Sequence, residues 1–399
     1  AIAFNNTVGV AGTSTITGVT TFYNTGTIRL GDYLSDVFNF NGGLTADLAS
    51  RISFKASQIS STNSALHLAS PMTFEASATL SAGSGQIDLA AITLNEGVTL
   101  TVGNSSQSGV LNLSSVTGQA GASAVSNLTL YSSGAVNVSG NIATKIGNLI
   151  LTNSAGATFS GAVGSSGDFV TAITLTATTG TVSFLGNLYS TSLSNPASSF
   201  DLQFYGSNTR VVNFVTLNTT GTVYFGDLTR TFIGCVCTGT TDPDILTFDR
   251  GIRHSGSNTI AGTFTKSTVT TCTGSDCGVH FDAGTTSFLG GNTTFDFSNM
   301  AIEFDNIVLA TGITLTLGGG DSGTFTIGSI TGTVHDDSYC PSNIVINTTG
   351  AVNILRNIGT NIGSLTLTNS GGATFAGNVT TGTSVVLTNT TGTIAFNGA

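Results

Sequence analysis

Leu128–Val163 reads LTLYSSGAVNVSGNIATKIGNLILTNSAGATFSGAV, and Ile344–Val379 reads IVINTTGAVNILRNIGTNIGSLTLTNSGGATFAGNV. The two stretches align without a gap, Leu128 on Ile344 and Val163 on Val379, and 20 of the 36 aligned positions are identical. Each alternates apolar and polar residues in short runs, which is typical of β-strands with one buried face. Glycine, serine and asparagine separate the runs, as expected for turns. Internal repetition on this scale indicates a repeat architecture.

The repetition extends over most of the chain. Shorter matches are AITLNEGVTLTVG from Ala91 with NIVLATGITLTLG from Asn306, TIRLGDY from Thr27 with TVYFGDL from Thr222, and AIAF at Ala1 with TVSF at Thr181 and TIAF at Thr393. These matches predict a first repeat over residues 1–180, a second over 181–392, and the start of a third over 393–399.

A shorter period lies within each repeat. Equivalent strands recur at a constant short distance, as from Leu128 to Leu149, with glycine turns and no helical pattern between them. Short strands at this period predict an all-β fold, a parallel β-solenoid with rungs of about 21 residues. A pair of antiparallel β-sandwiches is the alternative, but it does not explain the period. Stacked rungs would place like residues in ladders, and we expect inward phenylalanines on similar corners: Phe159, Phe184, Phe225, Phe375 and Phe396.

The composition excludes some classes of function. Of the 399 residues only 8% are charged, and the formal net charge is −10. A basic stripe that could neutralise phosphates is missing, so we expect no nucleic-acid partner. We expect no membrane span, because no apolar run reaches the length of a membrane helix. Ala1–Val10 lacks the pattern of a signal peptide.

The motif L-x-L-T-N-S-x-G-A-T-F-x-G begins at Leu149 and again at Leu365. It resembles the β-strand repeats of bacterial autotransporter passengers and filamentous-haemagglutinin-type adhesins, including rickettsial surface antigens. The resemblance implies a right-handed parallel β-helix exported to the cell surface, with a role in adhesion or fibre building. The implied partners are further repeat units or copies of the chain stacked end to end. Surface glycans bound through decorated loops are the alternative partner.

Five cysteines lie in or beside insertions that lengthen the second repeat: Cys235, Cys237, Cys272, Cys277 and Cys340. A metal site built from these thiols with Asp276 and His280 is one interpretation. Disulfides are the other, because C-x-C is not the C-x2-C pattern of structural zinc and an exported protein oxidises its thiols. We expect Cys272 and Cys277 to close a small loop and Cys235 or Cys237 to pair across adjacent rungs. We expect no metal and no cofactor.

Parallel β-helices also include enzymes that cleave polysaccharides with exposed carboxylates. The acidic candidates are Asp242, Asp244, Asp282 and the run His335-Asp336-Asp337. The first repeat lacks all of them, so we expect solvated loop residues rather than a catalytic site. GGGDSG at Gly318 resembles a calcium repeat but occurs once, and His67 and His280 occupy equivalent strand positions. The sequence therefore predicts a non-enzymatic extracellular structural protein, part of a long surface rod or filament.

Overall fold

A computed structural model describes residues 2–4, 11–227, 232–233, 236–237, 244–264, 277–289, 293–297, 299–334 and 340–398. The chain divides into two compact units, Ala1–Phe200 (the N-terminal unit) and Asp201–Ala399 (the C-terminal unit). The described residues form strands and turns, and none of them forms a helix that could cross a membrane. The predicted boundary at residue 180 separates two sequence repeats, and the division into compact units does not test it. It stays a prediction.

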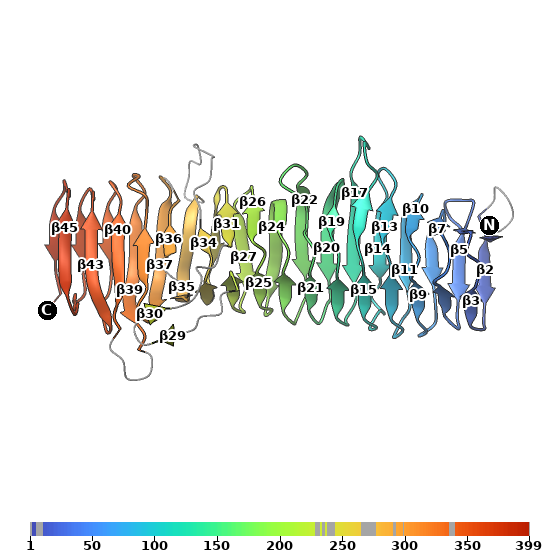
Figure 1. Ribbon diagram of the computed structural model, residues 1–399, viewed down its shortest axis with the longest axis horizontal. Helices are drawn as coiled ribbons and strands as arrows, with labels where there is room; N and C mark the ends of the chain where they lie inside the picture. Colours follow the sequence, from blue (N-terminus) through green and yellow to red (C-terminus); the bar gives the residue numbers. More distant parts are fainter. Residues whose placement is uncertain are drawn as a thin grey trace. The chain divides into compact units, whose positions relative to one another are not determined.

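The N-terminal unit is a coil of short strands that pair in parallel along three ladders (Figure 1). The first ladder is β1 (Ile2–Phe4), β4 (Thr27–Leu30), β7 (Arg51–Phe54), β10 (Met72–Phe74), β13 (Ile92–Leu94), β16 (Val116–Gly118) and β19 (Ile142–Ala143). The second is β2 (Thr13–Ile16), β5 (Val37–Phe40), β8 (Gln58–Ser60), β11 (Ala78–Ser81), β14 (Thr99–Gly103), β17 (Ser126–Tyr131), β20 (Ile146–Thr152), β22 (Val170–Thr176) and β24 (Leu188–Ser198). The third is β3 (Thr20–Phe22), β6 (Leu44–Ala46), β9 (Leu66–Leu68), β12 (Ile87–Leu89), β15 (Leu111–Leu113), β18 (Val136–Val138), β21 (Ala157–Phe159) and β23 (Val182–Phe184). Up to β19 each coil contributes one strand to each ladder, and the first ladder then continues as isolated bridges from Ile142 to Val163 and from Val163 to Leu188.

The C-terminal unit has the same plan. One ladder is β26 (Asn208–Val211), β31 (Ile245–Phe248), β34 (Thr263–Phe264), β36 (Thr293–Phe295), β38 (Thr314–Leu317), β40 (Ser342–Asn347), β43 (Ile362–Thr368) and β45 (Ser384–Thr388). A second is β27 (Val215–Thr219), β32 (Gly251–His254), β35 (Gly278–Phe288), β37 (Ala301–Leu309), β39 (Phe325–Gly332), β41 (Val352–Ile354), β44 (Ala373–Phe375) and β46 (Ile394–Phe396). The third begins with β25 (Leu202–Phe204), β28 (Val223–Phe225) and β33 (Asn258–Ile260), continues through the second halves of β35, β37 and β39, and reaches β42 (Ile358–Gly359). Beside these, β29 (Phe232–Ile233) and β30 (Val236–Cys237) pair in antiparallel fashion. The predicted all-β parallel β-solenoid is confirmed.

The length of a coil varies around the predicted value. In the N-terminal unit, the coil from Ile52 to Met72, which pair with each other, has few residues. The coil from Leu100 to its partner Leu128 has more. In the C-terminal unit, three spacings are wide because they contain the cysteine-bearing insertions: Arg210 with Thr247, Phe264 with Phe295, and Leu315 with Ile344. The insertions therefore lengthen loops and leave the strand ladders in register.

The repeated L-T-N motif marks a corner of the coil. Asn153, Asn369 and Asn389 each follow a strand and adopt a positive φ of 60°, 58° and 54°. Asparagine tolerates this left-handed conformation better than other side chains do. Gly156 and Gly372 follow at φ 140°, which a residue with a Cβ rarely adopts. These residues turn the chain from the long strand into the next face.

The repeat that begins at Leu128 and Ile344 is also a repeat of structure. Strands β17 to β21 match β40 to β44 one for one, and the register shifts at Ser126 in the first set and at Ser342 in the second. Both serine side chains are buried and donate to backbone carbonyls, Ser126 to Asn95 and Ser342 to Ala310. The AIAF match behaves differently, because β1 pairs with β4 whereas β23 pairs with β21 in another ladder. That short motif therefore does not mark equivalent places in the coil.

The core of each unit consists of the inward residues of the strands. Phenylalanines of adjacent coils stack in register, with ring centroids 5.0 Å apart for Phe159 and Phe184 and 4.7 Å for Phe375 and Phe396. Phe225 stacks at 5.6 Å on Phe204 of the preceding coil. Such stacks bury apolar area and hold the coils in register.

Phe159→Asp is expected to unfold the neighbouring coils and leave β4, β7 and β10 protected. Loss of a buried aromatic ring costs about 3–5 kcal/mol, and burial of an unpaired carboxylate adds to it. The strands of each coil pair only with those of the adjacent coils, so the damage stays local. Hydrogen exchange resolved by residue measures this. Thr158→Asp, on the outward side of the same strand, is the control; uniform loss of protection across the chain would contradict the linear scheme.

Candidate functional site

A row of polar side chains runs across four coils of the N-terminal unit. His67, Asp88, Asn112 and Asn137 are paired in register on the outward side of β9, β12, β15 and β18. Asn112 Nδ2 donates to Asp88 Oδ1 at 2.8 Å, and Asn137 Nδ2 donates to Asn112 Oδ1 at 2.9 Å. Because parallel strands stack at ~4.8 Å, equal positions on successive coils bring these groups into hydrogen-bonding distance. We call this set the polar row.

The imidazole at the head of the polar row lies between two carboxylates. His67 Nδ1 is 3.0 Å from Asp88 Oδ2, and His67 Nε2 is 3.5 Å from Asp47 Oδ1. Burial by itself would raise the pKa of Asp88. Hydrogen bonds from Asn112, Gln86 and His67, together with the His67 charge, outweigh burial and lower that pKa below 3.8. The Asp88 carboxylate is therefore ionised at neutral pH.

A hollow of about 260 Å³ lies beside the polar row. Its remaining lining comes mainly from small residues two positions after each member of the row, namely Ala69, Ala90, Ser114 and Ser139. Small side chains at the same position of four successive coils leave a depression next to the longer polar side chains. The hollow can accept a ligand that carries hydrogen-bond donors, because Asn112, one of its lining residues, has an amide oxygen that accepts a single hydrogen bond among the described residues and retains a lone pair.

The C-terminal unit carries a counterpart of this site in which the space is filled. His280 Nδ1 lies 2.7 Å from Glu303 Oε2, on paired positions of β35 and β37, and the His280 side chain is almost fully buried. Two residues after Glu303, Asp305 binds the guanidinium of Arg356, which lies against Gly328. An arginine therefore covers the place that is open in the N-terminal unit.

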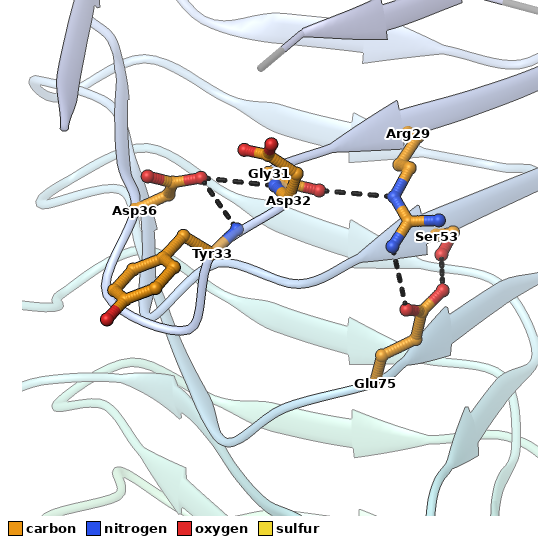
Figure 2. A network of polar contacts seen from close by, with 7 residues as sticks. All are labelled: Arg29, Gly31, Asp32, Tyr33, Asp36, Ser53 and Glu75. Atoms are coloured by element: carbon orange, nitrogen blue, oxygen red, sulfur yellow. Dashed lines mark hydrogen bonds and ion pairs between the residues drawn. The ribbon is translucent and has the colours of Figure 1, made fainter. Parts of the chain in front are cut away.

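A second polar network in the N-terminal unit is structural (Figure 2). The buried carboxylate of Asp36 accepts the backbone N–H groups of Gly12, Asp32 and Tyr33, each at 3.1 Å. Arg29 pairs with Glu75 at 3.1 Å across two coils, and the Ser53 hydroxyl donates to the same carboxylate. These bonds tie the turn after β4 to its neighbours, and they leave little acceptor capacity for a ligand.

The structure describes only part of the predicted cysteine set. Cys277 and Cys340 are buried and disulfide-bonded. Cys235 and Cys272 lie outside the described residues, and Cys237 is described only as the end of strand β30. The pairing of Cys272 with Cys277, and of Cys235 or Cys237 across rungs, stays a prediction.

The acidic candidates are not brought together among the described residues. Asp244 is buried, whereas Asp282 is exposed and accepts a hydrogen bond from the Ser255 hydroxyl at 3.2 Å. Asp242, Asp276 and His335-Asp336-Asp337 lie outside the described residues. In the described part of the chain, no three His, Cys, Asp or Glu side chains are placed to hold one metal ion. In the GGGDSG turn the Asp321 backbone carbonyl accepts two hydrogen bonds, one from the Thr348 hydroxyl and one from the Thr349 backbone N–H.

Comparison with known proteins gives no relative: no protein-family model, no curated protein and no solved structure matches this chain. The resemblance to autotransporter passengers and filamentous-haemagglutinin-type adhesins therefore rests on the repeat motif alone.

Sequence reasoning placed His67 and His280 on equivalent strands but missed their carboxylate partners. The signal was present, because Asp88 and Glu303 each follow their histidine by the length of one coil, 21 and 23 positions along the chain. Reading the polar residues at the predicted period of about 21 would have found the His67–Asp88 pair, whereas Glu303 lies two positions beyond that period from His280.

Asp88→Asn is expected to lower stability at pH 5–7 and to have little effect near pH 2. Asp88 has a lower pKa when folded than when unfolded, so between the two values the unfolded state binds more protons and stability rises with pH. The contribution is present above the unfolded pKa of about 3.9 and is lost as the pH falls through the folded pKa. Urea unfolding followed by far-UV circular dichroism measures it. Asp282→Asn is the control, and a variant effect that persists at pH 2 would contradict the assignment.

Reduction of the disulfides is expected to leave the N-terminal unit unchanged, because that unit has no cysteine and its described strands form their ladders without one. A peptide map without reductant should show Cys272 linked to Cys277 and no free thiol at Cys340. Hydrogen exchange with and without reductant should differ only in the C-terminal unit. A map with five free thiols would rule out the disulfide interpretation.

Proposed function

We propose that this chain is a non-enzymatic structural protein of the cell exterior, a section of a longer β-solenoid assembly. The observation that carries the proposal is the in-register stacking of each coil on the one before it, a pattern that a further coil can continue at the outer edge of β45 and β46. Val385 and Leu387 of β45 are 40% and 43% exposed, although Leu365 and Leu367, their paired residues one coil earlier, are fully buried. Phe396 is 50% exposed on its buried partner Phe375.

A further solenoid coil is the occupant that suits this edge. The inward row of β45 and β46 continues the core ladder of the unit, and the outer edge of these strands offers backbone groups for one more parallel strand. A stacked coil would bury the exposed valine, leucine and phenylalanine and extend both ladders. Head-to-tail stacking of this kind does not close on itself and builds a fibre.

Two features support an extracellular setting. Cys277 and Cys340 are disulfide-bonded, and disulfides persist in oxidising compartments. The repeat motif resembles that of exported bacterial surface proteins. Parallel backbone ladders that run through many coils and a surface rich in threonine, serine and asparagine suit a mechanical role, in which many weak outer contacts add up to avidity.

Leu387→Lys is expected to weaken end-to-end association of the chain. In the unchanged protein, sedimentation velocity should show association that increases with concentration, because the open edge is apolar. The lysine would place a charge in the core row and prevent a coil from stacking.

Val386→Lys is the matched control, because Val386 pairs with Thr366 in the outward row of the same strand. Far-UV circular dichroism checks that both variants keep their strands. A chain that stays monomeric at every concentration, or association that both lysines weaken equally, would contradict the proposal.

A further inference from the structure

The C-terminal unit shows which chemical group can fill the open hollow of the N-terminal unit. Glu303 of the C-terminal unit corresponds to Asp88, and two residues later Asp305 corresponds to Ala90. One coil further on, Gly328 corresponds to Ser114. The structure thus shows the same corner of the coil twice, once open and once occupied.

Arg356 is the occupant in the C-terminal unit. Its Nη2 donates to the Asp305 backbone carbonyl at 3.0 Å and to the Asp305 carboxylate. A Cβ added to Gly328 would collide with the same Nη2, so the guanidinium lies directly on the glycine. The chain itself therefore uses this corner to hold a guanidinium group.

The corresponding corner of the N-terminal unit presents unused acceptors. In the part of the chain that the structure describes, the Ala90 carbonyl, the equivalent of the Asp305 carbonyl, accepts no hydrogen bond. Asn112 Oδ1 accepts one bond, from Asn137, and retains a second lone pair. The Asp88 carboxylate adds a negative charge to the lining. Gly140 stands where the second repeat has Arg356, so the chain supplies no cation of its own at that position.

We propose that the hollow between the polar row and Ala90, Ser114 and Ser139 binds an arginine side chain of a partner polypeptide. A guanidinium has five donors in a plane and can address acceptors on neighbouring coils at once. The ammonium of lysine is a compact charge with three rotatable donors and lacks the fixed planar fork of a guanidinium. Asp88 is the acidic residue among the lining residues, and the chain as a whole has a formal charge of −10, which favours a cationic ligand. This binding site is separate from the stacking edge of the proposed function.

The test uses N-acetyl-arginine amide as the probe and N-acetyl-citrulline amide as its uncharged analogue of the same shape. Binding is measured on the full chain by backbone amide chemical shifts. We expect saturable shifts at Asn112, Ser114 and Ser139 with the arginine probe and an affinity at least ~10-fold weaker with the citrulline probe, because charge-assisted hydrogen bonds are the stronger ones. Equal binding of the two probes would overturn the proposal.

Three variants sharpen the test. Ser139→Arg adds a guanidinium two coils beyond Ala90, the span that Arg356 covers to reach Asp305, and is expected to abolish probe binding. Ser105→Arg adds the same charge outside the lining residues and should bind the probe as before. Arg356→Ala empties the corner in the C-terminal unit and should raise the stoichiometry from one probe to two.

Unchanged probe binding in Ser139→Arg would show that the hollow is not the site. Association of the chain with itself that Ser139→Arg abolishes, while Leu387→Lys does not, would assign the hollow to a second copy and overturn the partner named here. Failure of the stacking proposal would appear in the Leu387→Lys experiment alone, so the two results are distinguishable.

Discussion

In-register parallel pairing between successive coils is the constraint on which the rest of this structure depends. Each residue lies over its counterpart one coil earlier, so whatever occupies a position must be compatible with a like group at ~4.8 Å. Inward positions meet this with aliphatic side chains and stacked phenylalanines such as Phe54 on Phe74, at 4.6 Å. Outward positions meet it with threonine, serine and asparagine, which donate and accept hydrogen bonds along the column. Charged residues are scarce for the same reason, because like charges on adjacent coils repel.

The exceptions to that rule show how the coil tolerates charge. His67 is followed by Asp88 and His280 by Glu303, so each imidazole faces a carboxylate on the next coil. Arg210 binds the buried carboxylate of Asp249, with the shortest contact 2.9 Å from Nη2 to Oδ2. A side chain that would repel an identical side chain on the adjacent coil is thus paired with a group that binds it. The two repeats keep this pairing and change the residues that follow it, which leaves one corner open and the other filled by Arg356.

Insertions are accommodated outside the ladders. The wide spacing between Arg210 and Thr247 leaves both residues paired in a regular parallel strand. A coil can therefore gain a long loop without disturbing its neighbours, since loop length adds only slowly to the entropic cost of closure. The cysteines belong to these insertions, and the N-terminal unit forms the same ladders without any cysteine. Disulfides consequently act on the loops and the strands near them rather than on the fold as a whole.

The amino-acid sequence by itself determined the fold class, the alternation of inward and outward residues, the turns rich in glycine, serine and asparagine, and the long repeat shared by Leu128–Val163 and Ile344–Val379. These features are local or periodic, so a linear reading reveals them. Only the tertiary structure decided which polar residues meet, because coils of unequal length set the partner of each position and no constant period describes them. It also decided that AIAF at the start of the chain belongs to a different ladder from TVSF, and that small residues at Ala90 and Ser114 leave a hollow. Such contacts depend on which coil lies next in space. The physical reason is that strand register decides which residues are neighbours, and their separation along the chain does not.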